Sequence, residues 1–409
     1  MTKKSDAPAI RFKGFSDAWE QRKLGEIGSV SMCRRIFKEQ TSETGDIPFY
    51  KIGTFGAEPD AFISRELFEE YKSKYPYPQK DDILISASGS IGRTVVFAGN
   101  NEYFQDSNIV WLSHDERLSN PFLKCFYSVV KWAGIEGSTI KRLYNDNILN
   151  TVICMPSVPE QDRIGAFFEN LDYLITLHQR KYEKLTNVKK SMLEKMFPQN
   201  GSSYPEIRFK GFTDAWEQRK LSELTSMHAR IGWQNLRTSE FLDSGNYMLI
   251  TGTDFNDGAI NFWTCHYVER ERYEQDRNIQ IHNGSILITK DGTLGKVAYV
   301  QGLSMPATLN AGVFNVQIKD ANNVDEKYLF QYLKAPFLMD YVDKKATGGT
   351  IKHLNQSILV DFPVILPQRS EQTLIGAFFQ QLDNLITLHQ RELEKLQNIK
   401  KSMLEKMFV

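Results

Sequence analysis

Basic side chains stand beside short polar ones in several stretches of turn-like composition. Arg and Lys contact phosphates and guanine, whereas hydroxyl and amide side chains contact phosphates and adenine. Such a mixture favours contact with nucleic acid, although a solvated surface is the alternative at each position. The candidates are Arg34, Arg35 and Lys38 beside Phe37, Lys141 with Arg142, Lys344 with Lys345, and Lys352 with His353; short polar neighbours are Ser138, Thr139, Asn145, Thr350 and Asn355.

Two glycine-rich turns add further polar candidates. The sequence SGSIG covers residues 88–92, and DGTLGK covers residues 291–296. Their backbone amides could cradle a phosphate, but no helix is predicted to follow either turn, which favours ordinary hairpin turns. The candidate side chains in and beside these turns are Ser88, Ser90, Arg93, Lys290, Thr293 and Lys296.

No catalytic constellation accompanies these residues in the sequence. A phosphate-binding GxxxxGK[ST] loop, an HExxH motif and a GxSxG elbow are all absent, and the four cysteines, Cys33, Cys125, Cys154 and Cys265, lack metal-site or disulfide spacing. His178 and His389 occupy matching positions of a repeat and are interpreted as packed or interfacial residues. The sequence therefore offers no candidate catalytic residue and no candidate metal ligand.

Composition limits how the chain could bind an anionic polymer. Lys and Arg together number 50, as do Asp and Glu, so local patches rather than net charge must supply any attraction. The 409 residues, 41% of them hydrophobic, suffice for two to four domains. Scattered cysteines, no apolar run after the amino terminus and no 18-residue apolar segment predict a cytoplasmic protein without a membrane span.

The candidates must be positioned by elements that occur twice. Residues 164–197 return as residues 375–408 with seven differences in 34 positions, and 10–24 return as 207–221 with one difference. Apolar residues recur at helical spacing in each longer copy, predicting two helices of about 51 Å that pack on each other. The predicted seam and partner-binding positions are Ile164, Phe168, Leu171, Leu174, Leu185, Ile375, Phe379, Leu382, Leu385 and Leu396.

The remaining segments diverge between the two repeats. Residues 82–97 and 285–300 both predict β-hairpins within bodies of short strands. We therefore expect an α+β fold, a pseudo-twofold tandem duplication with two mixed bodies (residues 1–155 and 201–366) and two long helical segments (156–200 and 367–409). The short linker 198–205 predicts antiparallel coiled-coil helices, with Val409 near the first body.

This order of motifs resembles the specificity subunit of type I restriction-modification systems. The resemblance spans essentially the whole chain and is carried by RFKGFSDAWEQ, ILISASGSIG, GSTIKRL and the duplicated EQ, IGAFF and LITLHQR elements. It implies that the bodies are target recognition domains, each reading one half of a bipartite double-stranded DNA site. It also implies that the helices space the halves and bind two modification (methyltransferase) subunits.

By the same resemblance, catalysis belongs to partner subunits. S-adenosylmethionine would bind the modification subunits, and ATP and Mg would serve restriction subunits that translocate and cleave DNA. Two rival hypotheses remain at the level of sequence. One is a self-contained methyltransferase or nuclease, and the other is a protein scaffold that does not contact DNA.

Overall fold

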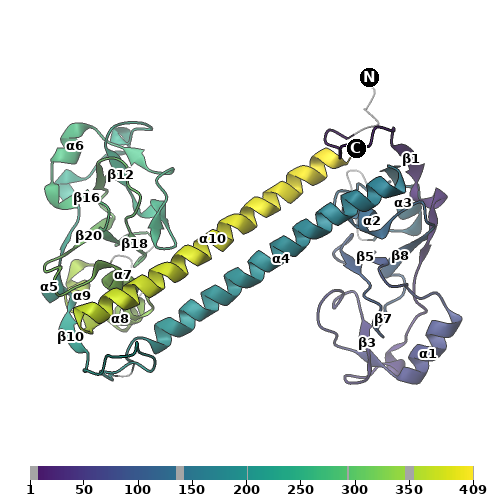
Figure 1. Ribbon diagram of the computed structural model, residues 1–409, viewed down its shortest axis with the longest axis horizontal. Helices are drawn as coiled ribbons and strands as arrows, with labels where there is room; N and C mark the ends of the chain where they lie inside the picture. The colour runs from purple at the N-terminus through teal and green to yellow at the C-terminus, as the bar shows by residue number, and fades with distance from the viewer. Residues whose placement is uncertain (1–7, 135–141, 200, 293, 346–353, 409) are drawn as a thin grey trace. The chain divides into compact units, whose positions relative to one another are not determined.

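The computed structural model describes residues 8–134, 142–199, 201–292, 294–345 and 354–408. The chain forms two compact units, of which the first comprises residues 1–180 and 390–409 and the second residues 181–389. Each unit therefore contains one body together with one end of each long helix (Figure 1). Below, the first body denotes residues 8–155 and the second body residues 201–366.

The first body combines three small sheets with short helices. Strand β1 (Glu20–Lys23) pairs with β9 (Val152–Met155), next to the start of the long helix α4. A four-stranded sheet has the order β2 (Gly28–Ser31), β8 (Ile109–His114), β5 (Ile83–Ser86) and β6 (Thr94–Val96), and a three-stranded sheet the order β4 (Phe62–Ile63), β3 (Ile47–Tyr50) and β7 (Tyr103–Phe104). The helices are η1 (Leu24–Glu26), η2 (Lys38–Gln40), α1 (Arg65–Lys74), α2 (Asn120–Tyr127) and α3 (Asn145–Asn150).

The second body repeats this plan with additions. Strand β10 (Glu217–Lys220) pairs with β21 (Pro363–Leu366), and the four-stranded sheet is β11 (Thr225–His228), β20 (Val313–Ile318), β17 (Ile286–Thr289) and β18 (Val297–Tyr299). Its other sheets are β15 (His266–Tyr267), β12 (Met248–Ile250), β19 (Ala307–Leu309) and β16 (Gln280–Ile281), and the hairpin of β13 (Phe255–Asn256) with β14 (Ala259–Ile260). Its helices are α5 (Leu221–Leu224), η3 (Gly232–Gln234), η4 (Thr238–Glu240), η5 (Gly252–Asp254), α6 (Arg270–Glu274), η6 (Arg277–Ile279), α7 (Glu326–Lys334), α8 (Phe337–Lys345) and α9 (Gln356–Leu359). The mixed α+β bodies and both predicted hairpins are confirmed.

The long helices start before the apolar repeat. Helix α4 covers Val158–Lys195 and α10 covers Arg369–Met407, so each contains a first turn with a Glu-Gln pair that the apolar periodicity could not predict. Glu160 in the first turn of α4 is fully buried and accepts two hydrogen bonds from Arg11, at 2.6 and 2.7 Å. In the second unit Glu371 is held by Arg208 in the same way, both at 2.8 Å. These pairs connect the repeated segments 10–24 and 207–221 to the starts of α4 and α10.

Within each unit the ends of the two helices pack antiparallel (Figure 1). In the first unit the beginning of α4 clusters with Leu396, Ile399 and Met403 from the end of α10, and Lys400 donates to Asp172. In the second unit the end of α4 lies against the beginning of α10, where Lys189 donates to Asp383 at 2.5 Å. The antiparallel arrangement predicted from the linker is therefore confirmed.

Two predicted seam residues are wrong in their placement. Leu174 and Leu385 are 38% and 44% exposed, whereas Leu171 and Leu382 are 8% exposed. The buried and half-buried apolar positions follow a heptad spacing, with steps of three and four residues starting at Ile164 in α4 and at Ile375 in α10, and the two exposed leucines lie beside that stripe. Leu185 and Leu396 are half-buried in the clusters, and the other six predicted seam residues are buried.

In each unit a backbone hydrogen bond joins the segment before the body to the end of a long helix. In the first unit the Ile10 amide donates to the Lys406 carbonyl at 3.0 Å, and the Phe408 ring stacks on Phe122. In the second unit the Ile207 amide donates to the Lys195 carbonyl at 2.9 Å. The end of α10 therefore lies beside the start of the first body, as the short linker predicted, although Val409 itself lies outside the described residues.

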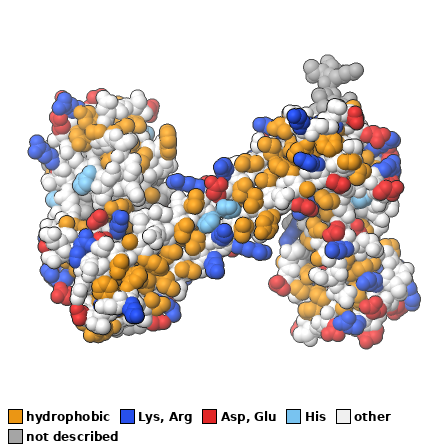
Figure 2. Space-filling model, viewed as in Figure 1, with side chains coloured by type: hydrophobic (Ala, Val, Ile, Leu, Met, Phe, Trp, Pro, Cys, Tyr) orange, Lys and Arg blue, Asp and Glu red, His pale blue; other side chains and the backbone are white. Residues whose placement is uncertain are grey.

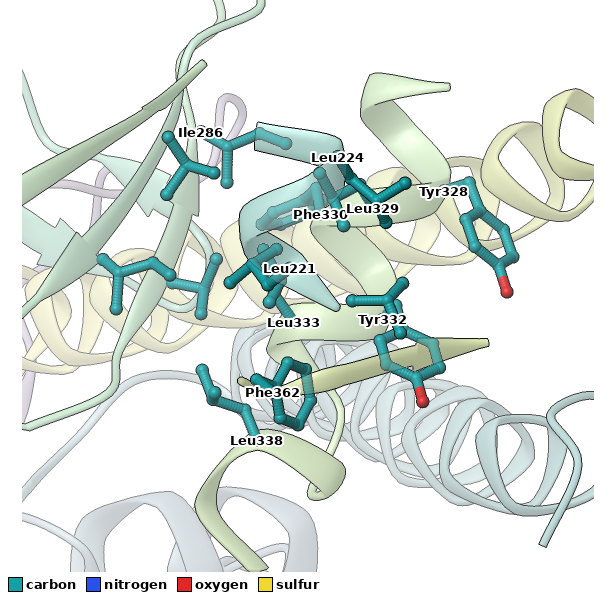
Figure 3. Close-up of a cluster of buried hydrophobic side chains, with 14 of the residues drawn as sticks. Leu221, Leu224, Ile286, Tyr328, Leu329, Phe330, Tyr332, Leu333, Leu338 and Phe362 are labelled. Atoms are coloured by element: carbon teal, nitrogen blue, oxygen red, sulfur yellow. The ribbon is translucent and has the colours of Figure 1, made fainter. Parts of the chain in front are cut away.

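Each body has a dense apolar core on which the helix ends rest. In the second unit Leu221, Leu333 and Phe362 meet in the interior between α5, α7 and the strand β21 (Figure 3). Ile375 and Phe379 of α10 join the same cluster. Over the described ranges, no helix is long and apolar enough to cross a membrane.

Candidate nucleic-acid interface

A buried hydroxyl fixes the hairpin turn in each body. The Ser86 side chain accepts from the Arg93 amide at 2.9 Å, and the Thr289 side chain accepts from the Lys296 amide at 3.0 Å. Ser86 and Thr289 are 1% and 0% exposed. The hydroxyl supplies an acceptor that the β-ladder does not, so both turns are held in a defined shape.

Loops distant in sequence converge on these turns through matching backbone hydrogen bonds. In the first body the Ala87 amide donates to the Asn108 carbonyl at 2.7 Å, and the Leu143 amide donates to the Ala87 carbonyl at 2.7 Å. In the second body Lys290 takes the place of Ala87, with Gly312 and Leu354 as its partners at 2.9 and 2.8 Å. Each body therefore gathers its hairpin turn and two further loops at one edge, which we call the loop edge.

Three polar candidates of the first body meet at the corner formed by residues 105–108. Arg35 pairs with Asp106 at 3.0 Å, and Arg142 donates to the Ser107 carbonyl at 2.7 Å. Ser88 donates to the Asn108 side chain at 2.9 Å. The structure thus brings Arg35, Ser88 and Arg142 together, although they are far apart in the sequence.

The other described candidates of the first body are on the hairpin turn and on the segment after β2. Arg93 is exposed and donates to the Gly56 carbonyl at 3.2 Å, linking the hairpin turn to the loop after β3. Arg34 lies over the Tyr75 ring at 5.2 Å from its centroid. Lys38 begins η2 and is exposed, as is Ser90 in the hairpin turn.

The described part of the second body presents Lys290 and Lys296 at its loop edge. Lys290 lies over the Phe314 ring at 5.4 Å, and Lys296 is exposed at the end of the turn. Helix α8 packs on this turn, since a Cβ on Gly295 would lie 2.1 Å from the Met339 sulfur, and the positive φ of 69° at Gly295 favours glycine there. Lys344 and Lys345 end that helix. Lys141, Thr293, Lys352 and His353 lie outside the described residues.

The residue buried behind the loop edge differs in kind between the bodies. Cys33, two residues beyond β2, is 2% exposed, and burial raises the pKa of its thiol to about 12. Arg230, two residues beyond β11, is 1% exposed and donates to the carbonyls of Leu309 and Gln234 at 3.0 and 3.3 Å. Burial, and then the nearby Arg272, lower the pKa of the Arg230 guanidinium.

The charge on these surfaces is local. On the face shown in Figure 2, Lys and Arg side chains are interspersed with Asp and Glu over both bodies. Within the parts of the chain that the structure describes, no cluster of His, Cys, Asp and Glu could hold a metal ion. The arrangement is suited to hydrogen bonding and phosphate contact by separate side chains.

Several residues of the loop edge were not predicted from the sequence. Asp106, Ser107 and Asn108 organise the first corner, and Ser107 has a positive φ of 52°. The sequence signal for this corner is the polar run 105–108, which directly follows the apolar strand β7. Ser86 and Thr289 could have been found as the shared hydroxyl position in the aligned sequences ILIS and ILIT.

Comparison with known proteins decides the family. A family model described as type I restriction modification DNA specificity domain matches residues 16–187 and again residues 213–398. The chain belongs to this family. The two matches coincide with the two repeats, each comprising a body and a long helix.

Individual relatives agree with this assignment. A putative type I restriction enzyme specificity subunit of Haemophilus influenzae is 57% identical over 165 residues, a match that spans 40% of each chain. The MjaVIII specificity subunit of Methanocaldococcus jannaschii is 23% identical over 79% of this chain and 74% of its own. The solved S subunit of a type I restriction-modification system from M. genitalium has a TM-score of 0.60 at 16% identity, covering 98% of this chain and 99% of that chain, which shows the shared fold.

Proposed function

We propose that this specificity subunit recognises a bipartite site on double-stranded DNA, one half with each body. The observation that carries the proposal is the loop edge. Matching backbone hydrogen bonds shape both edges, while the side chains they present differ. A shared framework with different side chains is suited to one mode of DNA contact with two sequence preferences.

The long helices are proposed to space the two half-sites and to bind two modification subunits. The exposed residues Lys190 and Glu194 of α4 are repeated without change as Lys401 and Glu405 of α10, although packing alone does not require this. Two identical partners need two matching surfaces. The exposed Leu174 and Leu385 are matching positions of the two repeats and are candidate contacts for such partners.

Chemistry is assigned to partners in this proposal. S-adenosylmethionine would bind the modification subunits, while ATP and Mg would serve restriction subunits. The specificity subunit would contribute recognition and assembly without catalysing a step itself. This division explains why the motifs of this chain concern binding surfaces and repeated helices.

Exchange of one body tests the proposal. Residues 25–155 are replaced by the equivalent body of a relative, and methylated sites are mapped across the genome of a host carrying the modification subunits. We expect one half of the target to change and the other half and the spacer to persist. Reciprocal replacement of residues 222–366 is the matched control, and joint alteration of both halves would contradict independent reading.

A further inference from the structure

The second body exposes one tryptophan almost completely. Trp263 is 97% exposed, whereas Trp19 and Trp216 are each 4% exposed. An exposed indole leaves a large apolar surface in water, and tryptophan is enriched at the energetic centres of binding interfaces. A fixed, solvent-facing tryptophan therefore points to a binding partner.

The turn that carries Trp263 is held in one shape. The Trp263 amide donates to the Asn261 side chain at 3.2 Å, and the Thr264 hydroxyl is 2.8 Å from the Asp254 carboxylate. The Asn261 amide donates to the Asp254 carbonyl at 2.8 Å. Because the backbone is already ordered, binding through this indole would cost little further conformational entropy.

The same aspartate connects this turn to the loop edge. Asp254 is 2% exposed and accepts from the Thr251 amide at 2.8 Å. The adjacent Gly252 lies against the hairpin, since a Cβ there would be 3.3 Å from the Thr289 side chain and 3.9 Å from the Asp291 carbonyl. Trp263 is thus anchored to the base of the turn that carries Lys290 and Lys296.

The equivalent segment of the first body, residues 51–61, lacks this feature. Strand β3 is followed by residues 51–61 before β4, whereas β12 is followed by the longer segment 251–265 before β15, which includes the β13–β14 hairpin. Residues 51–61 contain no tryptophan. Identical protein partners would require a matching feature in both repeats, so an indole present once fits a ligand that differs between the halves.

We propose that Trp263 packs its indole against a base or deoxyribose of duplex DNA beside the second half-site. The inference rests on the proposed function, because it takes DNA as the ligand of the loop edge. In a duplex the flat faces of the bases are covered by stacking, so the indole would lie against deoxyribose or the apolar edge of a base, and contact with the sugar carries no sequence information. Trp263 would therefore add affinity to the second half-site, and polar neighbours would supply base preference.

Binding of the assembled complex to its mapped site tests this. The wild-type complex and W263A, W263F and Y204A variants are titrated with the labelled cognate duplex, with co-purification of modification subunits and thermal unfolding measured in parallel. We expect W263A to weaken binding by roughly 10- to 150-fold, the effect of re-exposing one large apolar side chain. W263F should recover most of it, and Y204A, an exposed aromatic residue of the linker, should bind as wild type does.

Salt dependence provides a second readout. Trp263 carries no charge, so the W263A deficit should be the same at every salt concentration, whereas loss of a phosphate-contacting lysine lowers the salt slope by about one. A W263A complex that binds its site with unaltered affinity would overturn the inference. A W263A variant that loses its modification subunits but still binds DNA normally would also overturn it, because the indole would then contact protein. A wild-type complex without sequence preference would overturn the proposed function together with this inference.

Discussion

The two bodies share a backbone framework and differ in what they bury and present on it. A buried hydroxyl, Ser86 in one body and Thr289 in the other, accepts a hydrogen bond within each hairpin turn. Matching backbone hydrogen bonds then join two further loops to each turn. Behind these loops one body buries a thiol, Cys33, and the other a guanidinium, Arg230. The comparison indicates that strands and a few backbone contacts define the edge, while side chains there are free to diverge.

The repeated parts outside the bodies should respond alike to mutation. Glu160 and Glu371 are both 0% exposed and each accepts two hydrogen bonds from an arginine. E160A and E371A each leave that arginine without its partner in a largely buried site, and each should cost roughly 3 to 5 kcal/mol of unfolding free energy. Hydrogen exchange resolved by unit measures both, and a large difference between the two variants would show that the repeats are not energetically equivalent.

The buried residues behind the loop edges should respond differently. R230M removes a donor from several buried oxygens, including the Leu309 carbonyl, and should destabilise the second unit by about 2 to 3 kcal/mol. C33S in the first body changes only a small buried side chain and should cost about 1 kcal/mol. Denaturant unfolding followed by exchange mass spectrometry compares them, and an R230M variant as stable as wild type would mean that water replaces the guanidinium.

The two Lys-Asp pairs across the helix seam provide a finer test of equivalence. Lys189 bonds Asp383 and Lys400 bonds Asp172, with lysine side chains 11% and 28% exposed. K189M and K400M should each change stability by roughly 1 kcal/mol or less, because each aspartate keeps a second partner, Gln331 for Asp383 and Lys124 for Asp172. The K400M effect should be the smaller, since its pair is closer to solvent.

Lys189 also predicts a dependence on pH. Burial, and then Lys334, lower the pKa of Lys189 from its ordinary value of 10.5. Between the lowered pKa and 10.5 the unfolded chain binds more protons than the folded one, so stability rises with pH in that window. The unfolding free energy of wild type relative to K189M should therefore shift in favour of wild type as pH approaches 10.5, and an opposite slope would exclude the burial effect.

Features set by residues close together in the sequence were predicted better than features set by contacts between distant segments. The helices and hairpins follow from local periodicity, and the antiparallel pairing follows from a short linker. The seam was mispredicted at Leu174 because helical spacing alone does not separate a heptad stripe from an apolar neighbour beside it. A heptad count from Ile164 selects Ile175 rather than Leu174, and continued along the helix it also places Lys189 in the seam.

The loop edge could be predicted only in part. Arg35 and Arg142 were selected as candidates by composition, but their meeting at residues 105–108 depends on contacts between distant strands. Arg230 was not selected, because arginine is ordinarily exposed and its burial arises from the surrounding loops. Trp263 was missed because no local pattern distinguishes an exposed tryptophan from a core one.

The smallest expected effect concerns the corner that distinguishes the first body. Asp106 holds the Arg35 guanidinium at 3.0 Å, and this pair has no counterpart in the second body, where Gly232 stands at the position equivalent to Arg35. The Arg35 side chain is 60% exposed, so the pair contributes little to stability, typically below about 1 kcal/mol. Its role in the proposed function is to orient the guanidinium.

D106N should leave the unfolding free energy unchanged. By loosening Arg35, it should reduce discrimination at one position of the first half-site by roughly threefold, about 0.7 kcal/mol. Competition binding with single-base variants of each half measures this, with N310D at the equivalent corner of the second body as the matched control. Equal loss at both halves would mean that Asp106 supports the subunit as a whole rather than one contact of the first body.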